Sequence, residues 1–151
     1  MSTEPKAAKP QPTHRAAYAH FTAMPTRWGD NDSYGHVNNV VYYSFFDSAV
    51  NRHLIERGVL DIEGSAIVGL VIETRCTFFS SMGFPDTVQV GMKVVHLGNS
   101  SVRYEIALFR NDEDTASAVG HFVHVYVNRA DNRPVAIPAD VRAVLQTLVP
   151  A

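Results

Sequence analysis

The sequence predicts an α+β fold in which an antiparallel sheet packs against one long helix. Three observations support this prediction. Residues 39–57 have the pattern of one helix with a broad apolar arc, four runs of alternating apolar residues follow, and turn signals separate most of those runs. Strands joined by hairpins form antiparallel sheets with one face on the core. With 151 residues, the chain is expected to form one folded domain.

The helix is predicted over residues 39–57, after the Asn pair 38–39. Asn is a preferred N-cap because its side-chain oxygen accepts a hydrogen bond from a free amide of the first turn. Gly58 is the expected C′ residue. An apolar arc covering about half of the helix favours a curved sheet wrapped around it. The arc contains Tyr42, Tyr43, Phe45, Phe46, Ala49, Val50 and Leu54.

The strands are predicted from period-two alternation, and consecutive strands are expected to be neighbours in the sheet. Pro25 marks the segment before the helix as an edge or interrupted strand. Gly98-Asn99 predicts a tight hairpin turn. In the first long strand, the even-numbered side chains from Val68 to Phe78 are expected on one face. The predicted strands are 18–28, 67–79, 87–97, 101–110 and 115–128, followed by a short helix over 139–148.

The composition describes an ordinary globular protein, with 46% apolar and 19% charged residues. A formal net charge of -2 gives no general attraction for nucleic acid or anionic membranes. No apolar segment is long enough for a membrane span, and residues 1–17 lack the apolar stretch of a secretory signal. We expect residues 1–17 to form a flexible tail, residues 18–151 to form the domain, and the protein to be cytoplasmic.

The cysteine and histidine content does not predict a metal site or a cofactor. Cys76 is the single cysteine, and its alternating apolar neighbourhood favours a buried core position over a nucleophile. The seven histidines show none of the spacings typical of zinc-binding helices. His121 and His124 fall on opposite faces of the last strand, so they are not expected to act as a pair.

The residues suited to chemistry are concentrated in TRWGDNDSYGHVNNVVYYSFFD, residues 26–47. Asp30 and Asp32 lie a few residues before the predicted helix start, where backbone amides are free and the helix dipole is positive. A carboxylate there suits a base or nucleophile beside an oxyanion-stabilising site. On spacing alone, both aspartates could equally be loop-capping residues.

The chain resembles the hotdog-fold acyl-CoA thioesterases, in particular the branch of 4-hydroxybenzoyl-CoA and YbgC-like thioesterases. The resemblance covers residues 24–145. Its specific signature is WGDNDSYGHVNNVVYYSFFD, supported by the segments LGNSSVRYEI and GHFVHVYVNRADNRPVAIP. It implies a sheet wrapped around one long central helix, a homodimer joined through sheet edges with active sites at the interface, and in many relatives a homotetramer.

The resemblance also implies roles for individual residues. Asp32 matches the family's catalytic carboxylate, and the backbone amide of Asn39 matches the group that polarises the thioester carbonyl. Trp28 occupies an aromatic position that often lines the site. Asp47 and Glu73 are second choices for the carboxylate, because other branches place it on the helix or the next strand.

Four further residues are candidate substrate contacts, each with an equal or stronger structural interpretation. His36 could orient substrate or Asp32, or hydrogen-bond backbone groups. Tyr42 fits the core better than a pocket. Ser100 and Ser101 could contact pantetheine or stabilise their turn. The CoA phosphates could bind surface arginines, of which Arg103, Arg110, Arg129 and Arg133 are candidates.

We therefore expect an acyl-CoA thioesterase that hydrolyses acyl-CoA to free acid and CoA, with Asp32 as nucleophile or general base. A thiol leaving group with a pKa near about 8.5 departs with little help from an acid, so a carboxylate and oxyanion donors suffice. Two alternatives remain: a non-catalytic acyl-CoA binding module, and a hydratase or dehydratase acting on enoyl-CoA. The sequence leaves the acyl group undetermined.

Overall fold

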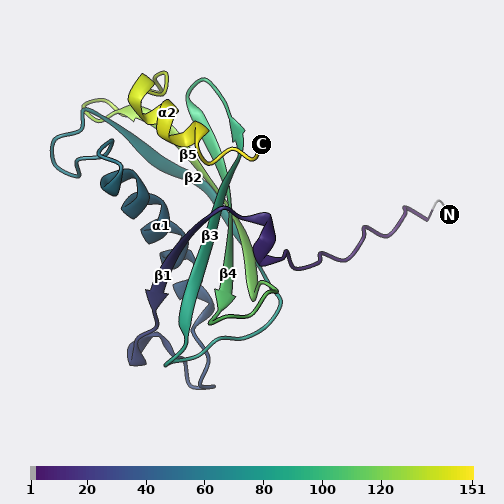
Figure 1. Cartoon of the computed structure of the whole chain (residues 1–151). Helices are drawn as coiled ribbons and strands as arrows, with labels where there is room; N and C mark the ends of the chain where they lie inside the picture. Colours follow the sequence, from purple (N-terminus) through teal and green to yellow (C-terminus); the bar gives the residue numbers. More distant parts are fainter. Residues whose placement is uncertain (1–2) are drawn as a thin grey trace.

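A computed structural model describes residues 3–151 and places one long helix against a curved five-stranded sheet (Figure 1). The predicted α+β architecture is confirmed. The first two residues of the predicted tail lie outside the described residues. Among residues 3–151, no helix is long and apolar enough to cross a membrane.

Helix α1, Asn39–Glu56, forms where the cap signals predict it. The Asn38 side chain accepts a hydrogen bond from the Val40 amide at 3.2 Å and so satisfies one free donor of the first turn. Gly58 follows the helix with φ +75°, a conformation that glycine adopts without steric cost. The apolar arc of α1 lies against the sheet, where Tyr42, Phe45, Phe46, Ala49, Val50 and Leu54 are buried.

All neighbouring strands of the sheet are antiparallel, and the strand order is β1-β3-β4-β5-β2. The expectation that β2 and β3 are neighbours is wrong. The segment between them is no hairpin: Phe79 and Ser80 donate to the Ser117 carbonyl, so the chain crosses the end of the sheet. The strands are β1 His20–Pro25, β2 Ile67–Phe78, β3 Thr87–Leu97, β4 Ser101–Arg110 and β5 Ala118–Asn128.

Strand β2 contains a bulge that the alternation does not predict. The register against β5 shifts between Val71 and Glu73, so Ile72 has no partner. Residues that pair directly share a face, and the extra residue switches the faces of the strand. Val71 pairs with the inward-facing His124. The even-numbered side chains of β2 therefore face the core only in the second half of the strand.

Strand β2 also forms an edge of the sheet with an exposed apolar surface. Leu70, Val71 and Ile72 are consecutive and expose 41%, 45% and 63% of their surface, and Phe78 exposes 45%. Cys76 is only partly buried, whereas the sequence predicted a buried core position. On the other edge, β1 ends at Pro25 as predicted for an edge strand.

The core lies between α1 and the concave face of the sheet. The even-numbered apolar side chains of β3 and β4, from Val88 to Val94 and from Val102 to Leu108, are almost fully buried there, as predicted. Gly120 makes room for the fully buried Phe46, because a Cβ at position 120 would lie 2.4 Å from the Phe46 ring. A second helix, α2 (Ala139–Gln146), packs against β3 and ends two residues earlier than predicted.

The segment before β1 contacts the outer face of the sheet. A short 3-10 helix, η1 (Arg15–Ala17), places Arg15 so that its guanidinium donates to the Asn111 and Glu113 carbonyls, both at 2.9 Å. The Ala116 amide donates to the Thr13 carbonyl. A domain boundary at residue 18 stays a prediction, and these contacts show that part of the chain before it packs on the domain.

Candidate active site

Asp30 holds the loop between the 3-10 helix η2 (Trp28–Asp30) and α1. Its side chain is buried and accepts hydrogen bonds from the Arg27 amide at 2.7 Å and the Arg27 guanidinium at 3.0 Å. Its carbonyl accepts from the Asn38 amide, which ties the loop to the helix cap. These contacts make Asp30 a structural residue of the loop.

A tight turn after Asp30 positions Asp32. The Asp32 amide donates to the His36 carbonyl at 2.8 Å, and the Gly35 amide donates back to the Asp32 carbonyl. Gly35 has φ +79°, which a residue with a side chain would adopt at a cost. The Val37 amide donates to the Met82 carbonyl, so the turn is also fixed to the crossing segment after β2.

The Asp32 carboxylate has one engaged and one open oxygen. Oδ1 accepts from the Tyr34 amide at 2.9 Å and the His36 amide at 3.4 Å. Among residues 3–151, Oδ2 has no hydrogen-bond donor, and no basic side chain forms an ion pair with Asp32. The carboxylate is half-buried. Backbone hydrogen bonds thus orient it while leaving one oxygen free to react.

The first amide of α1 is also open. The Asn38 side chain accepts a hydrogen bond from the Val40 amide, and the Asn38 backbone carbonyl accepts one from the Val41 amide. In the described part of the chain, no acceptor is bound to the Asn39 amide. A free N–H at the positive end of an 18-residue helix is suited to bind a developing oxyanion.

Asp32 and Asn39 line one cavity of about 350 Å³. Its wall includes Tyr42, whose ring meets Phe78 edge-to-face with centroids 4.8 Å apart. Burial raises the pKa of Tyr42, and the negative charge of Asp32 raises it further, so the hydroxyl stays protonated at neutral pH. The cavity is lined by Asp32, His36, Val37, Asn39, Tyr42, Phe78, Phe79, Ser80 and Ser81.

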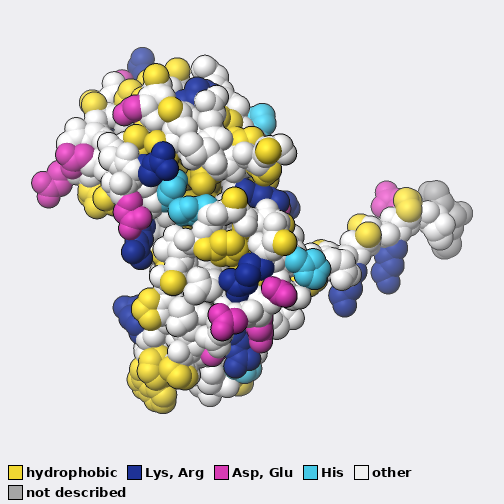
Figure 2. Space-filling view, in the orientation of Figure 1, with side chains coloured by type: hydrophobic (Ala, Val, Ile, Leu, Met, Phe, Trp, Pro, Cys, Tyr) yellow, Lys and Arg dark blue, Asp and Glu magenta, His cyan; other side chains and the backbone are white. Residues whose placement is uncertain are grey.

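Four predicted site residues therefore lie together, namely Asp32, His36, Asn39 and Tyr42. The other three lie elsewhere in the subunit. Trp28 is 77% exposed and packs edge-to-face on Phe84. Figure 2 shows a hydrophobic patch at the end of the molecule where the β1 arrow of Figure 1 ends.

Ser100 and Ser101 lie in the β3–β4 hairpin. The Ser100 carbonyl accepts from the Tyr126 amide, and the Ser101 carbonyl accepts from the Gly98 amide. These are contacts that stabilise the turn. Roles for Trp28, Ser100 and Ser101 in substrate binding stay predictions.

The second-choice carboxylates do not line this cavity. Asp47 is exposed on α1 and accepts from Asn51 at 3.1 Å. Glu73 is exposed on β2, with its carboxylate 3.8 Å from Arg103. Asp32 is thus the carboxylate that the fold brings to a cavity beside a helix N-terminus.

The arginines proposed for CoA phosphates have different partners. Arg110 pairs with Asp86 at 2.8 Å, and Arg133 lies 3.9 Å from Asp131. Arg129 donates to the carbonyls of Ile62 and Glu63. None of these contacts selects one arginine, and the phosphate-binding residues stay undetermined.

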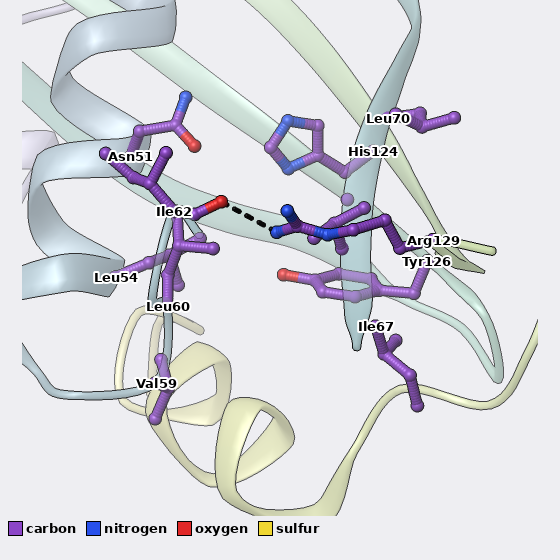
Figure 3. A pocket seen from close by; sticks show the side chains of 12 residues that line it. Asn51, Leu54, Val59, Leu60, Ile62, Ile67, Leu70, His124, Tyr126 and Arg129 are labelled. Atoms are coloured by element: carbon purple, nitrogen blue, oxygen red, sulfur yellow. Dashed lines mark hydrogen bonds between the residues drawn. The ribbon is translucent and has the colours of Figure 1, made fainter. Parts of the chain in front are cut away.

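A second cavity, of about 370 Å³, lies at the other end of α1 and β2, and it was not predicted from the sequence. It contains His124 and Tyr126 from β5, which are 2% and 3% exposed (Figure 3). A signal was present in the sequence: the alternation places both polar residues on the same face as Phe122, where apolar residues are expected.

The described residues contain no cluster of three or more His, Cys, Asp or Glu side chains arranged for a metal ion. Burial raises the pKa of the Cys76 thiol to about 12, which does not favour a thiolate nucleophile. The first cavity brings together the Asp32 carboxylate, the Asn39 amide and four other polar residues, His36, Tyr42, Ser80 and Ser81.

A scan of protein families matches residues 26–145 to the thioesterase-like superfamily. Among curated proteins, no significant match was found. The matched segment contains Asp32, α1 and all strands from β2 to β5.

Solved structures show the same fold. The PA5185 protein from Pseudomonas aeruginosa is 51% identical, with a TM-score of 0.90 over 93% of this chain and 98% of that one. PA2801, a proposed thioesterase from the same organism, is 33% identical, with a TM-score of 0.76 over 89% and 99% of the two chains. The BH1999 gentisyl-coenzyme A thioesterase is 25% identical, with a TM-score of 0.74 over 83% and 99%. These likenesses confirm the predicted hotdog fold and support thioester hydrolysis as the general reaction.

Proposed function

This chain belongs to the thioesterase-like superfamily, and we propose that it hydrolyses acyl-CoA thioesters to free acid and CoA. The observation that carries the proposal is the shared cavity of Asp32 and Asn39. Among residues 3–151, one oxygen of the carboxylate and the helix amide have no hydrogen-bond partner there. The gentisyl-coenzyme A substrate in the name of one structural neighbour supports CoA thioesters as the substrate class.

The reaction has two possible courses at Asp32. As a nucleophile, a carboxylate oxygen bonds to the thioester carbon, the C–S bond breaks, and CoA leaves as thiolate. Water then cleaves the resulting anhydride, which releases the acid and restores Asp32. As a general base, Asp32 takes a proton from water while the water oxygen bonds to the same carbon, and the departing thiolate receives the proton. In both, the Asn39 amide stabilises the oxyanion.

The two courses differ in whether an acyl-enzyme forms. Rapid quenching of a single turnover, followed by mass spectrometry of the peptide that contains Asp32, would detect an added acyl group in the nucleophilic course. Without that mass increase at times when thiol has already been released, the general-base course is supported.

The proposed activity is tested by measuring thiol release from a panel of aliphatic and aromatic acyl-CoAs. We expect wild-type turnover and a loss of about 10²–10⁴-fold in kcat for Asp32→Asn. Asp47→Asn is the matched control, because it removes an acidic side chain outside the cavity and away from β2; it should keep the wild-type rate. Equal rates for Asp32→Asn and wild type would exclude Asp32 from the mechanism.

The alternatives give different results in the same assay. An acyl-CoA binding module would bind the panel saturably and release no thiol. A hydratase would convert enoyl-CoA without thiol release, and it requires an acid/base pair at the acyl chain. Within the described part of the chain, His36 contacts the Asp32 carboxylate through its backbone amide, and no hydrogen bond between the two side chains supports the acid/base pair of a hydratase.

We also propose a homodimer formed through the β2 edges. An edge strand of 12 residues with consecutive exposed apolar side chains favours association with another strand. Two copies of the same edge can pair antiparallel about a two-fold axis, so that the unpaired backbone groups of each edge bond to those of the other. A further pairing of dimers into a homotetramer and a cytoplasmic location stay predictions.

A further inference from the structure

A row of charged and polar side chains crosses the outer face of the sheet and ends at an arginine on the β2 edge. In the strand register, Lys93 of β3 lies opposite Glu105 of β4, and Glu105 lies opposite His121 of β5. His121 in turn lies opposite Arg75 of β2. Because residues that pair directly share a face, these four side chains form one continuous row.

The acidic member of this row is engaged by its neighbours. One oxygen of Glu105 lies 3.1 Å from the Lys93 ammonium and accepts a hydrogen bond from the Tyr18 hydroxyl at 2.8 Å. The other oxygen lies 3.7 Å from His121 Nε2. The lysine therefore balances the charge of Glu105, and the carboxylate is not paired with Arg75.

Arg75 keeps most of its hydrogen-bonding capacity. Its Nε donates to His121 Nδ1 at 3.3 Å, which requires a neutral imidazole. Burial, and next the positive charge of Arg75, lower the pKa of His121 and so favour that neutral form. Among residues 3–151, Arg75 forms no ion pair, and its two terminal nitrogens have no acceptor. A guanidinium with two free nitrogens is suited to bind a phosphate through parallel hydrogen bonds.

The cavity beside Arg75 adjoins the Asp32 cavity. It has a volume of about 300 Å³, and its walls include Thr77 on β2 and Phe79, which directly follows the strand. Phe79 also lines the Asp32 cavity. The two cavities therefore share a wall residue at the end of β2. A long ligand whose reacting carbon lies beside Asp32 can extend past Phe79 to Arg75.

The N-terminal arm, residues 3–12, brings two further cations to this place. Pro10 and Gln11 form part of the cavity wall, and from there the arm extends away from the domain (Figure 1). Lys9 directly precedes these residues, and Lys6 lies three positions before Lys9. Both lysines are exposed, and Figure 2 shows basic side chains along the arm. In the described part of the chain, neither lysine forms an ion pair.

We propose that this cavity and the arm bind the phosphates of CoA, with Arg75 holding one phosphate group and Lys6 and Lys9 folding over the others. The inference rests on the proposed thioesterase function and deepens it, because it places the nucleotide end of the substrate. In CoA, the pantetheine chain separates the thioester from the phosphates, so the phosphates bind outside the cavity in which the thioester reacts. The arginines named as candidates from the sequence contact acidic side chains or carbonyls of the chain itself, whereas Arg75 does not.

The role of Arg75 is tested with pairs of substrates that carry the same acyl group, one as the CoA thioester and one as the pantetheine thioester without phosphates. Arg75→Gln should raise KM for acyl-CoA by about tenfold, as expected for one lost guanidinium–phosphate contact, and leave kcat unchanged. The pantetheine thioester should give the same kcat/KM with both proteins, because it has no phosphate to bind. An equal loss with both substrates would indicate a structural role for Arg75 and overturn the proposal.

The role of the arm is tested with two double variants. Replacing both lysines by alanine, Lys6→Ala with Lys9→Ala, should raise KM for acyl-CoA by about fivefold, because each exposed lysine contributes less than the guanidinium. Lys6→Arg with Lys9→Arg keeps the charge and should retain the wild-type KM. Added salt should raise KM for acyl-CoA more in wild type than in the alanine variant, since salt screens exposed charges. A wild-type KM in the alanine variant would contradict the assignment of the arm.

A binding measurement separates failure of this inference from failure of the proposed function. Isothermal titration with CoA needs no turnover, and Arg75→Gln should weaken CoA binding by about tenfold. Arg52→Gln is the matched control, because it removes an exposed arginine on α1 whose ion pair with Glu56 contributes little to stability. It should leave CoA binding and turnover unchanged.

The outcomes of the two measurements are distinct. CoA binding by wild type that depends on Arg75, without thiol release from any substrate, would remove the thioesterase proposal and support the phosphate site. Equal CoA affinity in wild type and Arg75→Gln would overturn the phosphate site, and so would a wild type that does not bind CoA. All substituted side chains are exposed, so the variants are expected to fold, and thermal unfolding checks this.

Discussion

At the scale of single residues, the fold surrounds several histidines with apolar groups. Burial lowers the pKa values of His20 and His53, whose rings lie 4.3 Å apart between β1 and α1. It lowers the pKa of His124 to about 4. The Nε2 atoms of the first pair and Nδ1 of His124 have no hydrogen-bond partner among the described residues. Protonation of these rings is therefore unfavourable in the folded state.

His124 makes stability depend on pH. In the unfolded chain its pKa is about 6.5, whereas the folded chain takes up this proton only near pH 4. The unfolded state thus binds more protons between these values, and stability falls as pH decreases through 6.5. From pH 7 to pH 5 we expect His124 alone to remove about 2 kcal/mol. Urea unfolding at both pH values measures this loss, and His124→Phe should reduce it; an unchanged loss would contradict the assignment.

The roles of Asp30 and Asp32 could be predicted only in part from the sequence. Both lie in one loop, two positions apart, and spacing alone did not separate them. The structure separates them through Arg27, which engages Asp30 with its backbone and its guanidinium. The resemblance assigns the catalytic role to Asp32, and that role stays a prediction. The position of Trp28 on the surface depends on Phe84, a residue far along the chain.

At the scale of elements, the first turn of α1 contributes backbone chemistry that a side-chain substitution cannot test. Asn39 is the first residue of the helix, where proline is tolerated because the missing N–H has no helical partner. Asn38 has φ -58° and ψ 137°, an extended conformation that the residue before proline prefers. Position 39 therefore permits removal of the proposed oxyanion donor alone.

We expect Asn39→Pro to reduce kcat by about 10²–10³-fold, the typical cost of one lost oxyanion donor. Asn39→Ala keeps the amide and should stay within about threefold of wild type, unless the side chain also binds substrate. Thermal unfolding should show both variants folded with similar stability. Wild-type activity in a folded Asn39→Pro protein would remove this amide from the mechanism.

The packing of Phe46 on β5 depends on Gly120. A methyl group at position 120 would overlap the ring and lie 2.8 Å from the Arg75 carbonyl, so both neighbours must move. We expect Gly120→Ala to lower the free energy of unfolding by about 1–3 kcal/mol, measured by urea denaturation. Gly29→Ala is the control, because no atom of residues 3–151 lies within 4 Å of the place that its new methyl group would occupy. Similar losses in both variants would indicate a general effect of glycine replacement.

Local sequence signals predicted the limits of the helices and strands better than they predicted which strands lie side by side in the sheet. The limits of β3 and β4 match the alternation, and Asn38 and Gly58 set the ends of α1 as predicted. The predicted order of the strands was wrong because the chain crosses the end of the sheet between β2 and β3. That segment is fixed by hydrogen bonds to distant residues, such as Ser117. The bulge at Ile72 likewise depends on pairing with β5, which alternation within β2 does not reveal.

At the scale of the whole molecule, the exposed apolar edge of β2 is the feature that favours self-association. Its exposed apolar residues are placed where a partner strand would cover them. The sequence indicated self-association through long edge strands, but which edge is free follows from the strand order alone.

Ile72→Lys should therefore separate assembly from folding. Ile72 is 63% exposed in the subunit, so a charged side chain there costs little in the monomer, but in paired edges it would place a lysine in the seam, and lysines on an edge strand oppose pairing with another strand. We expect sedimentation velocity to show a folded monomer in place of the dimer, with the thermal transition of the dissociated chain retained. The resemblance implies active sites at the dimer interface, so thiol release should fall by at least about tenfold. Val95→Lys introduces the same charge on β3 and should leave both assembly and activity unchanged. A monomeric Ile72→Lys protein with full activity would show that one subunit contains a complete site.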